Sequence, residues 1–556
     1  MTEKVLGRPG YDVTIKYIYK RMVNLYPDSE IVYKTKKGVF RHTYKDFADR
    51  VQSLANAMKS LGIGDLDRVA TLDWNTVWHL ESYFAIPMTG SILHPVNVRL
   101  SPNEIVYIFN LAEDKALIVH EDFLKLAELL ASRIKTLKAI IVVDTDSVPQ
   151  KIGDVKAYHY EDLLKENRGK YEFPELSEDR PAFMGFTSGT TGLPKGAYHS
   201  HKAMVLHAMS VAIHASTFGQ LKISSEDVIM HVVPMYHVYS WGLPFTSSIL
   251  GQKQVYPGRF IPKVYLELIQ NEGVTYFAGV PTILYMLLTD PESTKYNVSG
   301  VLFINGGSAL PEGLAKLALK RGMRIYVGYG LTETAPVLTL AAPPSKYYKK
   351  LSQEELFKIS LRTGYPIPLV DLEVVDPEMK PVPKDGKTIG EIVVRSPWIT
   401  PEYFKDEEKT EKAWRGGWFH TGDLAVVYED DSVFIMDRDK DVIKSGGEWI
   451  SSLRLEDAIS QHPGVSFVAV IAAKHEKWIE RPIAIIVPKK GYEDKINTEE
   501  INRFLIEKFV EPGIISKWWL PDKVIIVNEI PLTSTGKANK RILREKFSNV
   551  LEETSP

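Results

Sequence analysis

The sequence predicts an α/β protein: a large N-terminal domain of parallel sheets with flanking helices, a small β subdomain, and a small α+β C-terminal domain. Three observations support this. Short apolar runs alternate with helical patterns through most of the first 330 residues, which is typical of parallel sheets. Between residues 371 and 397 the pattern becomes alternating and rich in proline. After the charged run 437–441, helical and strand patterns alternate again to the C-terminus. A chain of 556 residues is also too long for one core.

The expected elements follow from hydrophobic periodicity. Thr43 is placed to cap a helix whose apolar residues recur on one face through Met58, with Asp46 completing the cap. Further helices are expected at 77–85, 123–130, 453–461 and 498–509. Strands are expected at 69–72, 116–119, 139–143, 228–233, 274–278, 301–305, 324–329, 389–395, 465–472, 483–487 and 523–528. In open parallel sheets ligands bind at the carboxyl ends of strands, so the turns after these strands are the candidate site.

Composition excludes several classes of protein. The net charge of -2 gives no electrostatic footprint for nucleic acid or an acidic membrane. The absence of cysteine excludes disulfides and thiolate catalysis, so any nucleophilic thiol must arrive with a substrate. The N-terminus has no secretory signal pattern, and the longest uncharged run, 228–252, contains Pro234 and Pro244, which favour a buried strand and loop over a membrane span. These observations predict a cytoplasmic protein.

The segment 187–196 is the strongest chemical signal. It combines three glycines, four hydroxyl side chains and Lys195, a composition that lets backbone amides, hydroxyls and one cation surround a phosphate. A Walker A loop is excluded because Lys195 follows a proline instead of the required glycine. The alternative interpretation is a surface linker rich in serine, glycine and threonine.

Four later motifs each offer a suitable group and each have a plainer alternative. In 329–334, Glu333 can hold a divalent cation and Thr332 a phosphate, although a capped strand-to-helix turn fits equally well. The glycines of 305–310 allow backbone to pass close to a flat ring, or form an ordinary loop. Asp423 ends a glycine turn and could accept two ribose hydroxyls, but such turns are common. Lys537 could be a catalytic cation or a solvated lysine near the C-terminus.

Taken together and in this order, these motifs resemble those of the adenylate-forming superfamily of acyl-CoA synthetases, luciferases and peptide-synthetase adenylation domains. The resemblance covers nearly the whole chain and includes the ten positions 187–196. It implies ATP as a substrate, held with Mg²⁺ on Glu333. The implied ATP-binding residues are Thr187, Ser188, Gly189, Thr190, Thr191, Gly192, Lys195, Gly307, Ser308, Ala309, Gly328, Tyr329, Gly330, Leu331, Asp423 and Arg438.

The resemblance also implies catalytic and acyl-binding residues. Lys537 would be the catalytic lysine of adenylation, assisted by Thr332 and Glu333, and His237 would gate the acyl site between half-reactions. The acyl pocket would be lined by Tyr236, Val280 and Gly330. Acetate-activating relatives have tryptophan at the position of Gly330, so glycine predicts room for a longer acid, of short to medium chain and possibly hydroxylated. His420 departs from the family pattern, which has arginine or tyrosine there.

A mobile C-terminal domain is implied as well, with boundaries at 1–437, a hinge at 438–441 and 442–556. Lys440 would be the pivot, although a solvated turn is the simpler interpretation of the charged run. The loop with Lys444, Gly446, Gly447 and Glu448 would contact the pantetheine arm of coenzyme A. Trp449 stands where many CoA ligases have arginine, and Asp437 where glycine is usual; Arg481 and Lys474 are candidate substitutes for the phosphate contact.

The predicted function is therefore AMP-forming ligation of a small carboxylic acid to coenzyme A, with no nucleic-acid partner. One alternative is an acyl-AMP ligase or an enzyme that loads a carrier protein, although no carrier segment is recognisable after Lys537. Another is a non-catalytic AMP-sensing protein, against which Glu333 and Lys537 argue. The sequence does not specify the oligomeric state.

Overall fold

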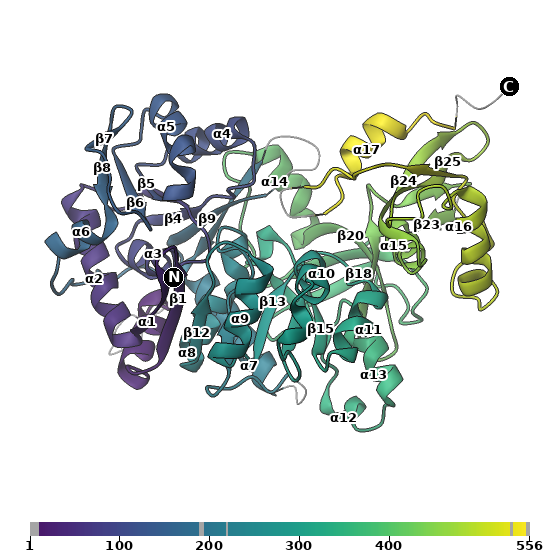
Figure 1. The fold of residues 1–556 in the computed structure, drawn as a ribbon, viewed down its shortest axis with the longest axis horizontal. Coiled ribbons are helices and arrows are strands. Elements are labelled where there is room, and N and C mark those ends of the chain that lie inside the picture. The colour runs from purple at the N-terminus through teal and green to yellow at the C-terminus, as the bar shows by residue number, and fades with distance from the viewer. Residues whose placement is uncertain (1–10, 188–193, 218–220, 447, 534–536, 552–556) are drawn as a thin grey trace.

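The computed structural model describes residues 11–187, 194–217, 221–446, 448–533 and 537–551. It confirms an α/β architecture with a large N-terminal part built on parallel sheets and a smaller C-terminal part (Figure 1). Among the described residues no helix has the length and apolarity needed to cross a membrane.

One large sheet has nine strands in the described chain, and its central pairs are parallel. Antiparallel strands complete its two edges. In spatial order the strands are β17 (Tyr365–Pro366), β16 (Val337–Leu340), β15 (Arg324–Gly330), β14 (Leu302–Asn305), β13 (Tyr276–Gly279), β11 (Val228–Met230), β12 (Lys253–Tyr256), β1 (Glu30–Thr35) and β2 (Gly38–Thr43).

The second large sheet has eight strands in the described chain and is parallel except at its ends. Its strands β5 and β6 are buried at every position, as their continuous apolar runs require. In spatial order the strands are β10 (Lys195–Ser200), β9 (Pro181–Thr187), β4 (Ile92–Pro95), β3 (Arg68–Leu72), β5 (Ala116–His120), β6 (Ala139–Val143), β8 (Val155–His159) and β7 (Lys151–Ile152).

Helices between and outside these two sheets bury their apolar faces. Residues of both sheets share one core with the helices between them, which are α1 (Ile15–Leu25), α2 (Tyr44–Ser60), α3 (Val77–Met88), α6 (Tyr160–Glu166), α7 (His201–Thr217) and α8 (Leu243–Leu250). The outer faces are covered by α4 (Pro102–Ala112), α5 (Leu124–Arg133), α9 (Pro262–Glu272), α10 (Pro281–Thr289) and α11 (Glu312–Lys320). Short helices α12 (Ser345–Tyr348), α13 (Gln353–Ser360) and α14 (Glu407–Ala413) follow.

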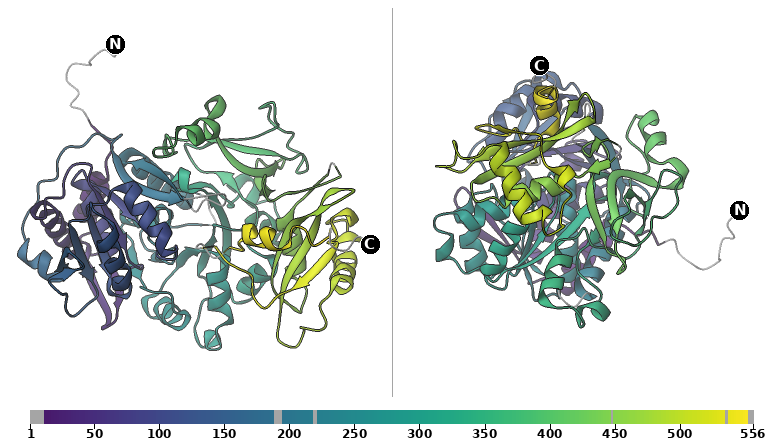
Figure 2. Two further views of the ribbon diagram at one scale, coloured as in Figure 1. Left: turned by 90° about the horizontal axis from the view of Figure 1, so that it is seen from above. Right: turned by 90° about the vertical axis from the view of Figure 1, so that its right-hand side faces the viewer.

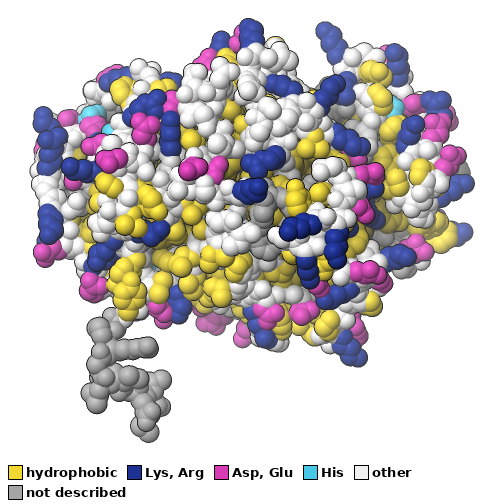
Figure 3. Space-filling view, turned by 90° about the horizontal axis from the view of Figure 1, so that it is seen from below, with side chains coloured by type: hydrophobic (Ala, Val, Ile, Leu, Met, Phe, Trp, Pro, Cys, Tyr) yellow, Lys and Arg dark blue, Asp and Glu magenta, His cyan; other side chains and the backbone are white. Residues whose placement is uncertain are grey.

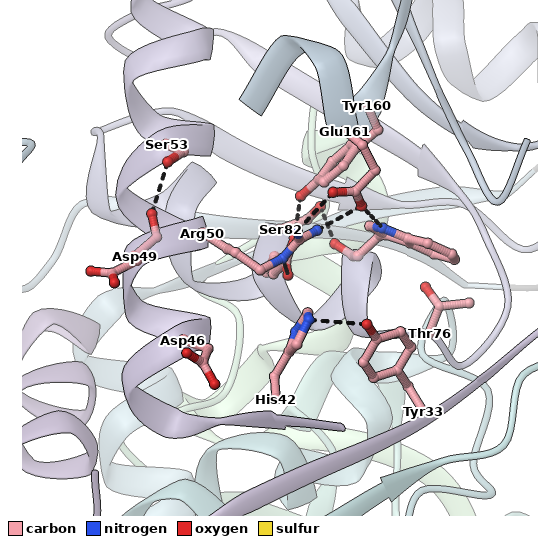
Figure 4. Close-up of polar contacts among 12 residues, drawn as sticks. Tyr33, His42, Asp46, Asp49, Arg50, Ser53, Thr76, Ser82, Tyr160 and Glu161 are labelled. Atoms are coloured by element: carbon pink, nitrogen blue, oxygen red, sulfur yellow. Dashed lines mark hydrogen bonds and ion pairs between the residues drawn. The ribbon is translucent and has the colours of Figure 1, made fainter. Parts of the chain in front are cut away.

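A buried ion-pair network fastens three of these helices. Arg50 of α2 contacts Glu81 of α3 and Glu161 of α6, and the Trp78 indole also donates to Glu161, at 2.8 Å (Figure 4). The Tyr160 hydroxyl donates to Glu81, whose side chain is fully buried. Because each buried charge has a partner of opposite sign and neutral donors, this network is satisfied and structural.

Two smaller sheets complete the chain. The antiparallel sheet contains β18 (Asp371–Val375), β19 (Gly390–Arg395), β20 (Phe419–Val427) and β21 (Val433–Arg438). The C-terminal sheet contains β22 (Ile443–Ser445), β23 (Glu448–Ile450), β24 (Val465–His475), β25 (Ile479–Pro488) and β26 (Lys523–Ile526), packed with α15 (Ser452–Ser460), α16 (Thr498–Leu505) and α17 (Lys540–Phe547). The segment before α17 runs from this part toward the N-terminal sheets in both views (Figures 1 and 2).

The sequence located most elements but misjudged some ends. The Thr43–Asp46 capping box is present, and β6 matches the expected strand. The strand expected at 228–233 ends at Met230, and the helix expected at 498–509 is regular only to Leu505 before a wider π-helical turn. On the face drawn in Figure 3, basic and acidic side chains are intermixed.

Candidate active site

The phosphate-loop candidate begins and ends on paired strands. Thr187 is the last residue of β9 and Lys195 the first of β10, and the two are paired across the antiparallel ladder. The ends of the loop are therefore held side by side at the carboxyl end of β9. The predicted residues Ser188, Gly189, Thr190, Thr191 and Gly192 lie outside the described residues, so their ATP contacts stay a prediction.

Lys195, Tyr403 and Glu333 form one cluster beside this loop. The Lys195 ammonium lies 4.2 Å from the centroid of the Tyr403 ring, and the Tyr403 hydroxyl donates to Glu333 Oε1 at 2.7 Å. Burial lowers the pKa of Lys195, while the Glu333 carboxylate opposes that shift. The backbone of Glu333 is fixed too, because its carbonyl accepts from Thr400 N–H at 2.8 Å. A cation and a carboxylate thus meet where the loop ends.

The Tyr329, Asp423 and Arg438 motifs also converge. The Tyr329 hydroxyl donates to Asp423 Oδ2 at 2.7 Å, and Arg438 Nε lies 2.9 Å from Asp423 Oδ1. Asp423 and Arg438 are register partners on β20 and β21, while Tyr329 comes from β15. Each carboxylate oxygen keeps a second lone pair, so Asp423 can still accept from ribose hydroxyls.

His420, which the sequence left unexplained, supports the turn that carries Asp423. Its Nδ1 lies 2.8 Å from Glu391 Oε2 on the neighbouring strand β19. The other oxygen of Glu391 accepts from Gly422 N–H at 3.1 Å, directly before Asp423. This histidine therefore fixes the carboxylate that holds the glycine turn.

The glycine turn after β14 is exposed on one side and packed on the other. Gly307, Ser308 and Ala309 are exposed, and Gly307 has a left-handed φ of 77°. Beneath them a Cβ on Gly306 would lie 2.6 Å from the Trp241 indole, so no side chain fits there. The exposed backbone can thus approach a flat ligand.

Val280 packs against this turn, since a Cβ on Gly307 would lie 3.2 Å from its Cγ1. Trp241 ends a run of three non-glycine residues in left-handed conformation, from Tyr239 onward. Such conformations are costly and persist where packing enforces them. Trp241 therefore has a fixed place between the turn and the protein interior.

A cavity connects several predicted residues. It is lined by His94, Pro95, Asn97, Leu100, Ile108, Gly185, Phe186, Thr187, Pro194, Tyr236, His237, Val238, Tyr239 and Thr332. The end of the phosphate loop, Thr332 and the two acyl-site candidates Tyr236 and His237 thus border one space. Burial, and then the Lys537 cation, lower the pKa of His237 to about 4, so this histidine is neutral at physiological pH.

Lys537 reaches the N-terminal part in this conformation. Although the residue as a whole is exposed to solvent, desolvation of its ammonium group is the largest cause that lowers its pKa to about 8. Repulsion from Arg438 and Lys440 adds to the shift, and Asp423 opposes it. Its effect on His237 places the Lys537 charge near the acyl-site candidates as well.

The charged run 437–441 is not simply a solvated turn, and that expectation was wrong for Asp437. This side chain is buried, and its Oδ2 accepts from the Ser452 N–H at 2.6 Å and from the Ser452 hydroxyl at 2.7 Å. Burial of a carboxylate is tolerated because these donors replace water. Asp441 pairs with Arg544 at 2.7 Å, whereas Lys440 is exposed. The domain boundaries and the pivot role of Lys440 stay predictions.

The predicted coenzyme A loop follows the charged run and contacts it. Lys444 pairs with Asp439 at 3.2 Å, and Gly446 N–H donates to Trp478 O at 3.0 Å. Glu448 begins β23 and is exposed, while Gly447 lies outside the described residues. Their roles stay predictions.

Arg481 was suggested as a substitute phosphate ligand, and its surroundings argue against that role. It is 6% exposed and donates to Asp522, Ser445 and two backbone carbonyls. Lys474 is exposed, and Trp449 is 40% exposed. The buried arginine is therefore a structural group of the C-terminal sheet.

The missing side chain at Gly330 does not leave open space in this structure. A Cβ at Gly330 would lie 1.8 Å from the carbonyl oxygen of Pro336, so the glycine is required by the close approach of β16. Gly328 is similarly crowded, since its Cβ would meet Leu340 at 2.9 Å. Leu331 donates its N–H to Thr334, which closes a short helical turn over Thr332–Thr334. Gly330 does not open space for an acyl chain.

Comparison with known proteins identifies the family. Residues 19–404 match the AMP-binding enzyme family, and residues 454–537 match the AMP-binding enzyme C-terminal domain. The chain belongs to the AMP-binding enzymes. A relative in Thermus thermophilus named a long-chain-fatty-acid–CoA ligase is 42% identical over 534 residues, or 95% of each chain.

Other AMP-binding enzymes similar to this one differ in the acid that they are named for. A medium-chain-fatty-acid–CoA ligase of Ectopseudomonas oleovorans is 34% identical, covering 94% of this chain and 93% of that protein. A 4-hydroxybutyrate–CoA ligase of Metallosphaera sedula is 33% identical, covering 91% and 90%. The crystal structure of ATP-bound MatB from Rhodopseudomonas palustris is 25% identical with a TM-score of 0.79, covering 96% of this chain and 99% of that one.

Two residues of this AMP-binding enzyme's site escaped the sequence analysis. Tyr403, which joins Lys195 to Glu333, lies in a segment without a glycine or hydroxyl motif. Trp241 lies in the uncharged run interpreted only as buried strand and loop. The one available signal was an aromatic residue within otherwise small and polar neighbours, which is too common to predict a site.

Proposed function

We propose that this AMP-binding enzyme joins a carboxylic acid to coenzyme A in two steps. In the first, the carboxylate attacks the α-phosphate of ATP, giving an acyl adenylate and pyrophosphate. In the second, the thiol of coenzyme A displaces AMP. The names of the relatives support the acceptor, since the three relatives described above are called CoA ligases.

One observation carries the first step: cations and carboxylates from four separate motifs meet around one site. Lys195 and Glu333 lie at the phosphate loop, and Asp423 is fixed by Arg438. Lys537, from the C-terminal part, interacts electrostatically with Asp423 and Arg438. Carboxylate attack on a phosphate brings two anions together, so a lysine between them lowers the barrier electrostatically. We assign that role to Lys537.

The residues fit a magnesium ion held mainly by substrate. In the described part of the chain no cluster of three acidic or histidine side chains could bind a metal. Mg²⁺ bound to nucleotides commonly uses one or two carboxylates and the phosphates themselves. Glu333 would be that carboxylate, and the bound ion would neutralise phosphate charge. The Tyr403 hydroxyl keeps Glu333 oriented toward Lys195.

An apolar cavity supports an aliphatic acid longer than acetate. It is lined by Val211, Ala215, Ile223, Trp241, Leu243, Thr246, Tyr276, Ala278, Ile304, Val337 and Leu340. Trp241 stands between this cavity and the glycine turn at Gly306. Burying each methylene of a chain contributes about 0.8 kcal/mol, which favours an acid longer than acetate, although the cavity volume of about 30 Å³ admits only one or two water-sized groups unless its lining moves.

Pyrophosphate release tests the proposal directly. The full-length protein is assayed with ATP, Mg²⁺ and a series of acids from acetate to palmitate, including hydroxybutyrate, with and without coenzyme A. We expect release that needs an acid and that becomes catalytic only with coenzyme A. Release equally fast without coenzyme A would indicate an acyl-AMP ligase or carrier loading, and no release with any acid would indicate a non-catalytic AMP-binding protein.

A further inference from the structure

A buried histidine–aspartate pair borders the cavity of the candidate site. His94 is the third residue of β4, and Asp114 follows the end of α4. His94 Nδ1 lies 2.9 Å and 3.1 Å from the two carboxylate oxygens of Asp114, and both side chains have zero exposure. None of the nucleotide motifs includes either residue.

The cavity brings His94 into the same space as the reaction. Its lining also includes Thr187 at the end of the phosphate loop, Thr332, and the acyl-site candidates Tyr236 and His237. The imidazole is held by neighbouring rings, with centroids 5.0 Å from Phe186 and 5.9 Å from Phe109. The pair is thus rigid and borders this cavity, whose volume is about 20 Å³ in this conformation, so the cavity must widen before a thiol can reach His94.

The contact with Asp114 determines which nitrogen carries the proton. A carboxylate can only accept, so Nδ1–H donates to Asp114, and the neutral ring keeps a lone pair on Nε2. Nε2 is buried and has no hydrogen-bond partner among the described residues. Other buried histidine nitrogens of the described chain also lack a hydrogen-bond partner in the protein, but none of those histidines lines this cavity.

Few charged groups surround the pair. Asp114 faces His94 from the end of α4, and the Arg68 guanidinium of β3 acts on Asp114. Tyr198 of β10 lies near Asp114, and Tyr236 and His237 also line the cavity. Burial raises the pKa of Asp114, and the neighbouring His94 opposes that shift. One carboxylate therefore dominates the environment of the imidazole.

We propose that His94 is the general base that takes the proton from the coenzyme A thiol in the second step, with Asp114 as its positioning residue. The inference rests on the proposed function. The chain has no cysteine, so the attacking thiol belongs to the substrate, and a thiol attacks as its thiolate. A nitrogen lone pair fixed by a carboxylate on the opposite side of the ring is the arrangement that general bases use.

In the proposed transfer to coenzyme A, the S–H proton moves to His94 Nε2 while the sulfur forms a bond to the acyl carbon. The bond between that carbon and the phosphate oxygen breaks, and AMP leaves with the electron pair. The imidazolium then returns its proton to solvent before the next turnover.

Two other assignments fit less well. A phosphate oxygen needs a hydrogen-bond donor, whereas the neutral ring offers an acceptor at Nε2. His237 also borders the cavity, but its pKa is lowered to about 4 and no carboxylate contributes to that shift, so it is a poor base near pH 7. The thiol therefore matches His94 better than pyrophosphate does.

The test separates the two half-reactions in the intact protein. Acid-dependent ATP–pyrophosphate exchange without coenzyme A reports adenylate formation, and single-turnover transfer from preformed acyl adenylate to coenzyme A reports the second step. For His94→Gln we expect exchange within about twofold of wild type and transfer slowed by about 100-fold or more at pH 7. The loss should shrink as pH rises toward the thiol pKa of about 8.5. Asp114→Asn should likewise slow transfer much more than exchange, and the pH profile of its transfer should be shifted.

His120→Gln is the matched control. His120 is also a buried histidine paired with an aspartate, with Nε2 3.4 Å from Asp144, and it is not among the residues that line the cavity. This variant should leave both half-reactions unchanged. Should His94→Gln fail to fold, Asp114→Asn decides by the same two assays.

Equal losses in exchange and transfer would assign His94 to phosphate binding or to folding and would overturn the inference. Unchanged transfer in His94→Gln would also overturn it. A wild-type protein that forms adenylate but never transfers to coenzyme A would overturn the proposed function, and the inference with it.

Discussion

The protonation of Lys537 sets a pH limit for adenylate formation. Free lysine has a pKa of about 10.4, but desolvation and the nearby Arg438 and Lys440 cations lower the pKa of Lys537 to about 8. Only the charged form can offset the two anions that meet in the first step. Because the shift is downward, the cation is lost as pH rises through about 8, well within the range of an assay.

The expected size follows from that value. With a pKa of about 8, the protonated fraction falls from about nine-tenths at pH 7 to about one-tenth at pH 9, so kcat/KM for ATP should fall roughly tenfold. An unshifted lysine would lose only about 4% of its charge over that interval. The assay is acid-dependent pyrophosphate exchange without coenzyme A, in buffers of constant ionic strength.

Two variants separate Lys537 from other titrating groups. Arginine stays charged, so Lys537→Arg should be slower than wild type but independent of pH up to 9. Lys537→Ala should lose about 100-fold to 1,000-fold in exchange and spare transfer from preformed adenylate. Lys440 also has a pKa of about 8 and is one of the cations that lower the pKa of Lys537, so Lys440→Ala should keep a decline and move it to higher pH. A decline that persists in Lys537→Arg, or a flat wild-type profile, would refute the assignment.

Three further outcomes follow from the contacts. Lys440→Pro should spare pyrophosphate exchange and block transfer to coenzyme A, because proline restricts the proposed pivot; equal effects on both assays would contradict the hinge. Asp423→Asn should weaken ATP binding about tenfold in calorimetry, because it removes the partner of Arg438 and an acceptor for ribose. An equal loss in binding of the acid would count against the ribose-binding role of Asp423. Asp437→Ala leaves the Ser452 donors unpaired, so it should lower the free energy of unfolding in urea by about 1–3 kcal/mol, and a neutral result would show that water replaces the carboxylate.

The residues proposed for the nucleotide site are those whose chemistry is local in sequence. Lys195, Glu333, Asp423 and Lys537 each belong to a short motif with glycines or hydroxyls, and the structure brings the four together. The fold was predictable for the same reason, since continuous apolar runs such as 139–143 can hardly form anything but buried strands.

Residues that act through tertiary contacts could not be predicted. Tyr403 has no motif, and its role depends on a contact with Glu333 across 70 positions. Asp437 was expected in solvent because its four neighbours are charged, but the Ser452 donors make burial possible. The glycine at 330 was interpreted as open space, whereas a crossing strand occupies the direction of its Cβ. Sequence shows that a side chain is absent but does not show what fills its place.

In the proposed mechanism, the charges around Lys537 would also help the C-terminal part to leave the site after the first step. Arg438 and Lys440 repel Lys537 and contribute to its lowered pKa. A bound polyphosphate would offset this repulsion, so Lys537 is most stable near the site while a polyphosphate is bound. Once pyrophosphate departs, the anionic charge that opposes this repulsion is smaller. Other contacts also join the parts: Glu312 N–H donates to the Asp457 carboxylate at 3.2 Å, and the Ser452 N–H and hydroxyl donate to Asp437; a typical hydrogen bond contributes about 1 kcal/mol. Burial raises the pKa of Asp457 to about 6, so its docked carboxylate is disfavoured above that pH. We therefore expect adenylate formation itself to favour the swing that admits coenzyme A.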